Sequence, residues 1–165
     1  MTESEKLQYA ANAKALMEEI FTSRKHSIVQ MMRPQLVRCE PEALSVTFAF
    51  PGMEWECNPT GAVHGGIVCA MFDTAMGLTL YPLIGVLTPT ISLNTSFLRP
   101  APGNGTILVR AAITKRGQSV LYISAEMWEE SAPDKIVGTA QGVFHVPAAA
   151  SDRTQCADSC RLYES

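Results

Sequence analysis

The sequence has no excess of positive charge. Its 13 Lys and Arg residues are outnumbered by 16 Asp and Glu, which gives a formal net charge of −3. General nucleic-acid binding needs a basic surface and is therefore disfavoured, although a local basic patch for a phosphorylated ligand stays open. The polar N-terminus lacks a signal-peptide pattern, and the apolar run over residues 65–72 stops at Asp73, too short to span a bilayer. We expect a cytoplasmic protein that binds neither nucleic acid nor membranes.

Cysteine is scarce and has no metal-binding spacing. The five cysteines include no Cys-x-x-Cys pair, which indicates reduced thiols in a cytosolic protein rather than a disulfide framework. Cys156 and Cys160 could be neighbours on a helical tail, but no histidine lies near them in the sequence. We therefore expect no metal site.

The remaining composition is that of an ordinary globular domain. The chain has 165 residues, of which 47% are hydrophobic and 18% charged. That length corresponds to one domain, and it suffices to bury a core without disulfides or metals. The same balance excludes whole-chain disorder, collagen and coiled coils.

The N-terminal part predicts helices followed by a pair of strands. Thr2 and Glu5 fit a capping box at the start of a helix over residues 2–21. A second short helix is predicted over residues 27–32, before Pro34. Strands are predicted over residues 35–40 and 43–50, with a turn at Pro41 and Glu42.

The rest of the chain predicts one long helix and four more strands. A stretch that is apolar on nearly every side follows His64-Gly65-Gly66, as expected of a helix inside a protein. Period-two patterns follow, and the short connections between them predict antiparallel neighbours. These four strands are expected over residues 90–98, 105–116, 118–129 and 135–146.

This order of elements predicts an α+β fold with an antiparallel sheet. One sheet leaves half of a helix uncovered when that helix is apolar all round. A second copy of the chain is the simplest further layer, with part of it supplied by the N-terminal helix. Residues from 148 onward form a polar tail whose function is not readable.

Two features of the long helix point to chemistry. Asp73 is the one charged residue in its interior, and a carboxylate there must be paired, hydrogen-bonded or functional. Gly65 and Gly66 lie where the first helix amides have no internal partners, so a carbonyl oxygen that gains negative charge could be stabilised there. A structural Asp73, and glycines that merely let the chain turn, are the alternatives.

The spacing of these features predicts a shared site. Gly65 and Asp73 are eight positions apart, or about 12 Å along a helix. One carbonyl group cannot contact both within the same chain. Two antiparallel copies of the helix would place Gly65 of one chain beside Asp73 of the other, so a reaction that uses both residues needs a dimer.

The motif from Asn58 through His64-Gly65-Gly66 to Asp73 resembles that of the hotdog-fold acyl-CoA thioesterases, above all the phenylacetate-degradation (PaaI-like) branch. The segment TISLNTSFLRPA, residues 90–101, resembles the strand after the helix in that family. The similarity spans roughly residues 36–146. It implies a sheet of about five or six strands wrapped around the long helix. We divide the chain into an N-terminal helical segment (1–34), a hotdog domain (35–147) and a tail (148–165).

The resemblance also implies roles for residues at matching positions. Gly65 matches the glycine whose amide polarises the thioester carbonyl, and Asp73 matches the acid of the opposite subunit that activates water or attacks. Asn58 matches an asparagine that orders the water or the thioester, and His64 a histidine beside it. Thr90 stands where some members carry a serine that positions the nucleophile.

The implied substrate is an acyl-CoA, hydrolysed to the free acid and CoA without a further cofactor, by a homodimer that pairs into a tetramer. A thioester is reactive enough that a carboxylate and an oxyanion site can suffice. Gly66 and the cations Arg99, Lys115 and Arg116 are expected to bind the CoA moiety. Phe72, Met76 and Tyr81 are candidate walls of an acyl groove.

Three other functions are weighed against hydrolysis. A non-catalytic acyl-CoA binding or sensing protein could use the same fold, but would be expected to lack the acid at Asp73. A hydratase or dehydratase of this fold typically places its histidine and acid differently. A dimerising scaffold would be favoured by an Asp73 capped by backbone amides with no cavity beside it.

Overall fold

A computed structural model describes residues 1–23 and 27–146 of the chain. The expectations for the tail, including those for Cys156 and Cys160, fall outside these residues. The elements are α1 (Glu3–Ser23), α2 (Ile28–Met32), β1 (Gln35–Glu40), β2 (Ser45–Pro51), α3 (Gly65–Ile84), β3 (Thr90–Phe97), β4 (Thr106–Arg116), β5 (Val120–Glu129) and β6 (Ile136–His145), with short 3₁₀ turns at Pro41–Ala43 and Glu54–Glu56.

The N-terminal helix starts as its capping box predicts. The Thr2 amide donates to the Glu5 carboxylate at 2.7 Å, and the Glu5 amide donates to Thr2 Oγ1 at 3.3 Å. These two bonds satisfy backbone donors that the first helical turn leaves free. The predicted helix at residues 27–32 is confirmed as α2, with Ser27 as its N-cap.

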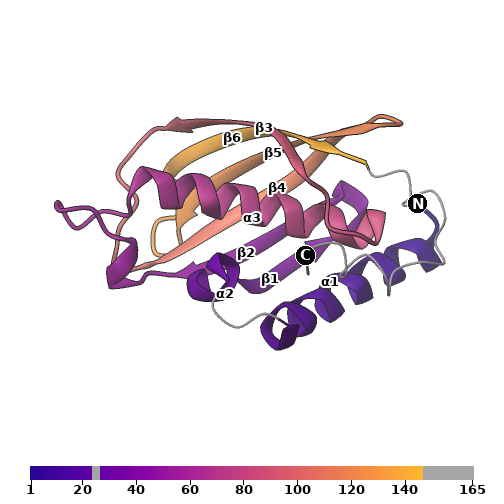
Figure 1. Cartoon of the computed structure of the whole chain (residues 1–165), viewed down its shortest axis with the longest axis horizontal. Coiled ribbons are helices and arrows are strands. Elements are labelled where there is room, and N and C mark those ends of the chain that lie inside the picture. Colours follow the sequence, from indigo (N-terminus) through magenta and orange to yellow (C-terminus); the bar gives the residue numbers. More distant parts are fainter. Residues whose placement is uncertain (24–26, 147–165) are drawn as a thin grey trace, which may run out of the picture.

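Six antiparallel strands form one sheet in the order β1-β2-β4-β5-β6-β3, which curves around α3 (Figure 1). The α+β class and the hotdog architecture are confirmed. Strands β4, β5 and β6 are neighbours as predicted, but the expectation that β3 lies beside β4 is wrong, because β3 pairs with β6.

The connection from β3 to β4 explains this error. It contains Pro100, Pro102 and Gly103 and resembles a tight turn in the sequence. Its backbone instead crosses the end of the sheet and bonds to other segments. The amides of Leu98 and Arg99 both donate to the Val137 carbonyl, and the Val63 amide donates to the Ala101 carbonyl. The segment is a crossover, so β3 lies at an edge of the sheet.

Helix α3 lies on one face of the sheet, and α1 packs against both α3 and β1 (Figure 1). Tyr9 of α1 donates to the Thr79 carbonyl at 3.0 Å, and Asn12 donates to the Pro82 carbonyl at 3.2 Å. The N-terminal helix thus covers the C-terminal half of α3, as expected. The expectation that this apolar segment is too short to span a bilayer is wrong by length and composition, because the helix continues past Asp73 to Ile84, but most of it is buried inside the fold.

Candidate active site

Helix α3 begins at a histidine that acts as its N-cap. His64 has extended backbone angles, and its Nδ1 accepts a hydrogen bond from the Gly66 amide at 3.0 Å. An accepting Nδ1 carries no proton, so the proton of the neutral ring lies on Nε2. The Gly66 amide is therefore used within the helix start and is not free for CoA.

The neighbouring Gly65 amide is the free donor of this helix start. It has no acceptor among the residues that the structure describes. It lies at the positive end of a helix of 20 residues, where a developing negative charge is stabilised. The arrangement fits the oxyanion role that the sequence predicts for Gly65.

Asn58 lies in the loop before α3. Its side-chain Oδ1 accepts hydrogen bonds from the backbone amide and the hydroxyl of Thr60, at 2.9 and 2.6 Å. The backbone amide of Asn58 donates to the Ala62 carbonyl. The His64 amide donates to the Glu56 carbonyl at 2.7 Å. These bonds hold the loop against the helix start and fix where Asn58 lies relative to His64.

Asp73 accepts a hydrogen bond from Thr90, the residue at the position where some members of the resembling family carry a serine. Thr90 Oγ1 donates to Asp73 Oδ1 at 2.6 Å, which leaves Oδ2 without a partner among the described residues. Asp73 is half-buried, and none of the ion pairs in the described part of the chain involves it. The carboxylate is thus held in place at one oxygen and open at the other.

A β-bulge explains why Thr90 reaches Asp73. The pairing of β3 with β6 shifts register between Thr90 and Ser92, so that Thr90 lies opposite the buried Phe144 and Ser92 lies opposite Val143. Without the extra residue Ile91, Thr90 would share a sheet face with Ser92, away from α3. The bulge turns its hydroxyl to the helix.

The structure separates the two halves of the predicted site within one chain. Phe97, at the end of β3, lies against Gly65, and Thr90, at the start of β3, binds Asp73. The strand therefore runs opposite to the helix, with one half-site at each end. Thr90 and Phe97 are seven positions apart in the sequence, which corresponds to roughly 20 Å along an extended strand.

The predicted CoA-binding cations are not gathered in one place. Arg99 follows β3 near Gly65 and donates to the Ile136 carbonyl at 2.5 Å. Lys115 and Arg116 end β4 at the opposite end of the sheet, where the Lys115 ammonium lies 5.9 Å from the Tyr122 ring centroid. Within one chain, the candidate cations therefore lie at two separate places.

The predicted acyl-groove walls also need correction. Phe72 and Met76 are completely buried in the core, because their side of α3 faces the sheet, so neither lines an open groove. Tyr81 is half-buried near the end of α3. The sequence reasoning missed Phe97, an exposed aromatic beside Gly65, since an aromatic in an alternating strand is usually core.

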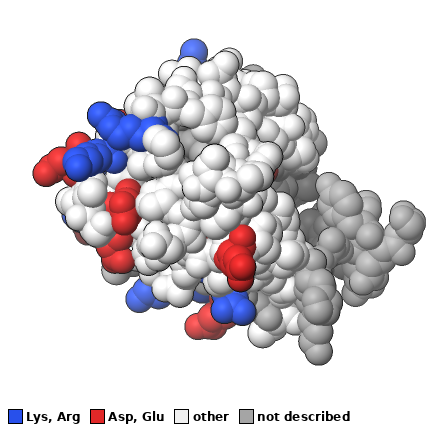
Figure 2. Space-filling model, turned by 90° about the vertical axis from the view of Figure 1, so that its left-hand side faces the viewer, with Lys and Arg blue, Asp and Glu red and all other residues white. Residues whose placement is uncertain are grey.

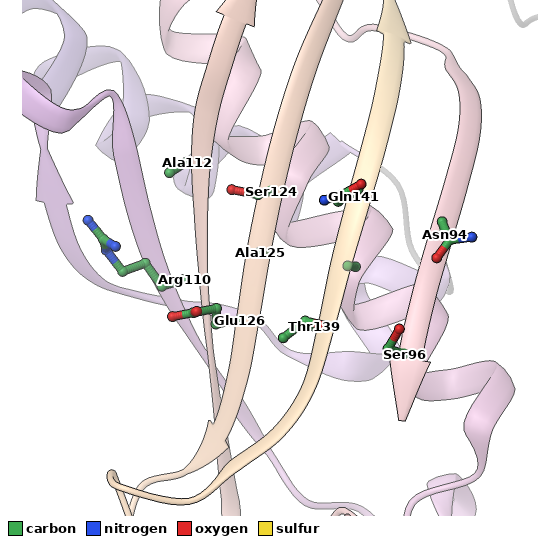
Figure 3. A pocket seen from close by; sticks show the side chains of 10 residues that line it. Asn94, Ser96, Arg110, Ala112, Ser124, Ala125, Glu126, Thr139 and Gln141 are labelled. Carbon is green, nitrogen blue, oxygen red and sulfur yellow. The ribbon is translucent and has the colours of Figure 1, made fainter. Parts of the chain in front are cut away.

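A polar hollow lies on the outer face of the sheet, on the side away from α3 (Figure 3). Its volume is about 530 Å³, and its lining side chains come from β3, β4, β5 and β6, among them Asn94, Arg110, Ser124 and Gln141. The sheet separates this hollow from the side on which Asp73 and Gly65 lie, so it is not part of the candidate active site.

Residues 60–134, which include Gly65, Asp73 and Thr90, match the model of the Thioesterase superfamily. A curated relative from Halobacterium salinarum that bears the name of an esterase is 38% identical over 64 residues, which is 36% of this chain and 41% of that protein. The chain therefore matches about two-fifths of that relative's length.

Several solved structures share this fold. A phenylacetic acid degradation-related protein from Ralstonia eutropha has a TM-score of 0.70 at 24% identity, covering 82% of this chain and 99% of its own. Escherichia coli PaaI gives 0.72 at 16%, covering 86% and 95%. Mouse thioesterase superfamily member 2 gives 0.69 at 18%, covering 89% and 100%. At these identities the likeness establishes the hotdog fold.

Proposed function

We propose that this chain is a thioesterase that hydrolyses an acyl-CoA or aryl-CoA to the free acid and CoA. The observation that carries the proposal is that one chain provides both a free helix-start amide, at Gly65, and a half-buried carboxylate, Asp73, whose position Thr90 fixes. The superfamily match over residues 60–134 supports the same reaction class. No further cofactor is invoked.

The proposed reaction uses the two groups in complementary roles. The Gly65 amide donates to the thioester carbonyl oxygen and stabilises the negative charge that forms on it. The Asp73 carboxylate attacks the carbonyl carbon or removes a proton from an attacking water. The carbon–sulfur bond then breaks, and the CoA thiolate takes up a proton that the water supplies. If water attacks directly, the free acid forms in this step. If Asp73 attacks, the acyl group stays on its carboxylate as a mixed anhydride, which water then cleaves to the free acid and the Asp73 carboxylate.

Both groups act on one carbonyl only if two chains share the site. Among the strands that the structure describes, β3 is an edge strand and pairs only with β6, and Ile91 and Phe97 on it are more than half exposed. Such an edge favours pairing with a second copy. A two-fold axis through the middle of β3 would place the Thr90 end of one strand beside the Phe97 end of the other. Asp73 of the partner subunit would then lie near Gly65.

The same dimer would bring the separated cations closer together. Arg99 follows the Phe97 end of β3, whereas Lys115 and Arg116 share the end of the sheet with Thr90. We propose that Arg99 of one chain and Lys115 and Arg116 of its partner bind the phosphates of CoA. Their replacement by alanine should raise KM for every acyl-CoA alike. Two such dimers would form the tetramer.

Thiol release from a panel of acyl-CoAs tests the proposal. The panel spans acetyl, medium-chain, long-chain and phenylacetyl esters, and wild type is compared with Asp73→Asn, which keeps the shape of the side chain. We expect turnover by wild type and a loss on the order of a hundredfold or more in the variant. A folded dimer that binds CoA but hydrolyses none of these esters would instead support a non-catalytic acyl-CoA binding protein.

A further inference from the structure

An exposed aromatic ring lies directly beside the candidate oxyanion amide. Phe97 is the last residue of β3, and a methyl group added at Gly65 would lie 3.6 Å from two of its ring carbons, Cε1 and Cζ. The Phe97 side chain is 57% exposed. A large apolar side chain that stays open to solvent next to a reactive donor is available to a ligand.

The neighbouring residues explain why Phe97 is not part of the core. Its cross-strand partner is Gly138, and a side chain at Gly138 would meet the ring of Phe72 at 3.4 Å. The buried Phe72 ring thus fills the space beside Gly138. Phe97 is left at the open edge of the sheet, over the start of α3.

The backbone fixes the ring in this place. The amides of the next two residues, Leu98 and Arg99, both donate to the Val137 carbonyl, at 2.9 and 3.0 Å. These two hydrogen bonds hold the backbone at the end of β3, so the Phe97 ring forms one wall beside the Gly65 amide. In the proposed dimer the wall faces the shared site, since the Phe97 end of β3 meets the Thr90 end of the partner's strand.

A thioester carbonyl at Gly65 has two substituents, and their chemistry differs. The acyl group is the apolar one, while the pantetheine arm carries amides that need hydrogen-bonding partners. An aromatic ring gains most by covering apolar surface. The end of the molecule at which α3 begins consists mostly of uncharged residues, with charged side chains in separate groups (Figure 2). Arg99, the cation that follows β3 at this end, is assigned in the proposed dimer to the phosphates of CoA and is then not left for a charged acyl group.

We propose that Phe97 contacts the acyl group and sets the preference of this enzyme for apolar acyl groups, aromatic or aliphatic, over acetyl and over acyl groups that end in a carboxylate. The inference rests on the proposed thioesterase function. Its substrate class follows from the ring beside Gly65.

The test compares kcat/KM for acetyl-, octanoyl-, phenylacetyl- and succinyl-CoA in wild type, Phe97→Ala and Phe97→Leu. We expect Phe97→Ala to lower kcat/KM about tenfold or more for the octanoyl and phenylacetyl esters and less than about threefold for acetyl-CoA. Phe97→Leu, which keeps apolar bulk, should retain most of the octanoyl activity. Val37→Ala is the matched control, because Val37 is 55% exposed on the opposite edge strand, β1.

The outcomes are distinguishable. An equal loss for all four esters in a folded Phe97→Ala dimer would place the ring against the pantetheine arm or in the dimer contact and overturn the inference, as would no loss at all. In either case the thioesterase function would stand. If wild type hydrolyses none of the esters, the proposed function fails and the inference fails with it.

Discussion

Thr90 Oγ1 donates a hydrogen bond of 2.6 Å to Asp73 Oδ1, from the first residue of an edge strand to the middle of the core helix. The bond exists because an extra residue, Ile91, shifts the register of β3. It orients the carboxylate and leaves its second oxygen open. In the proposed reaction, Thr90 therefore acts through Asp73 and is a positioning residue.

Removal of the Thr90 hydroxyl should lower kcat and leave the melting temperature nearly unchanged. Thr90→Val keeps the shape of the side chain but removes the donor, so Asp73 samples other orientations and kcat falls about tenfold. Thr90→Ser keeps the donor and should stay within about threefold of wild type. Steady-state thiol release measures both. Equal kcat values in the valine variant and wild type, at unchanged melting temperature, would remove Thr90 from the account.

Glu56 gives a pH dependence of stability. Its side chain is fully buried in the loop before α3, and its Oε2 accepts from the Met53 amide at 3.1 Å. Burial raises the pKa of this carboxyl above its ordinary value, and the Met53 hydrogen bond offsets part of that rise. The folded chain therefore holds the proton more tightly than the unfolded chain. The contribution of Glu56 is fully present below the unfolded pKa and is lost as pH rises through the folded one.

Glu56→Gln should remove this pH dependence, since the amide is neutral and its oxygen can still accept from Met53. We expect the variant to be more stable than wild type at neutral and alkaline pH, and similar to wild type in acid, below the ordinary pKa of a glutamate. Thermal unfolding across this pH range measures the difference. A difference that stays constant with pH would show that Glu56 does not titrate between the two states.

Gly103 should not tolerate a side chain. A methyl group there would overlap Cys57 Sγ and approach the Gly61 carbonyl oxygen to 2.6 Å. Both belong to the loop that precedes His64. We expect Gly103→Ala to lower the free energy of unfolding by about 1–3 kcal/mol and to reduce kcat, because that loop must shift. Asn104→Ala, at an exposed neighbour, is the control. Unchanged stability in Gly103→Ala would contradict the packing described here.

The sequence predicted the helices and strands more accurately than it predicted which strands pair. Strand periodicity and caps are local, so the boundaries of β1 and α2 could be inferred directly. The pairing of β3 with β6 could not, because it depends on a crossover whose Pro and Gly residues also fit a tight turn. The bulge at Ile91 could not be predicted either, because nothing in the alternating residues of this strand signals it. The spacing of the motif identified Asp73 and Gly65 as candidates. Only the structure shows that β3 contacts both of them, one at each of its ends.

The separation of the candidate cations could be inferred from the sequence. Arg99 and Lys115 are 16 positions apart, and strand β4 runs between them, so they lie at opposite ends of the sheet. The burial of Glu56 could not be inferred, because nothing in its neighbours predicts that the 3₁₀ turn Glu54–Glu56 buries it. That burial arises from packing between segments distant in sequence.

In the proposed dimer, each site takes Gly65 from one chain and Asp73 from the other. Subunit complementation distinguishes such a shared site from a site within one chain. Gly65→Pro removes the amide proton. The change suits the first helical position, since His64 already has the extended angles (φ −61, ψ 137) that a following proline prefers. Asp73→Asn removes the carboxylate. Each variant alone should be inactive.

Co-expression of the two variants with different tags gives mixed dimers, which are isolated by sequential affinity steps. A shared site predicts that each mixed dimer contains one intact site and one doubly impaired site, so its specific activity recovers to about half that of wild type. A site within one chain leaves every site with one defect. Mixed dimers as inactive as the separate variants would therefore contradict the account.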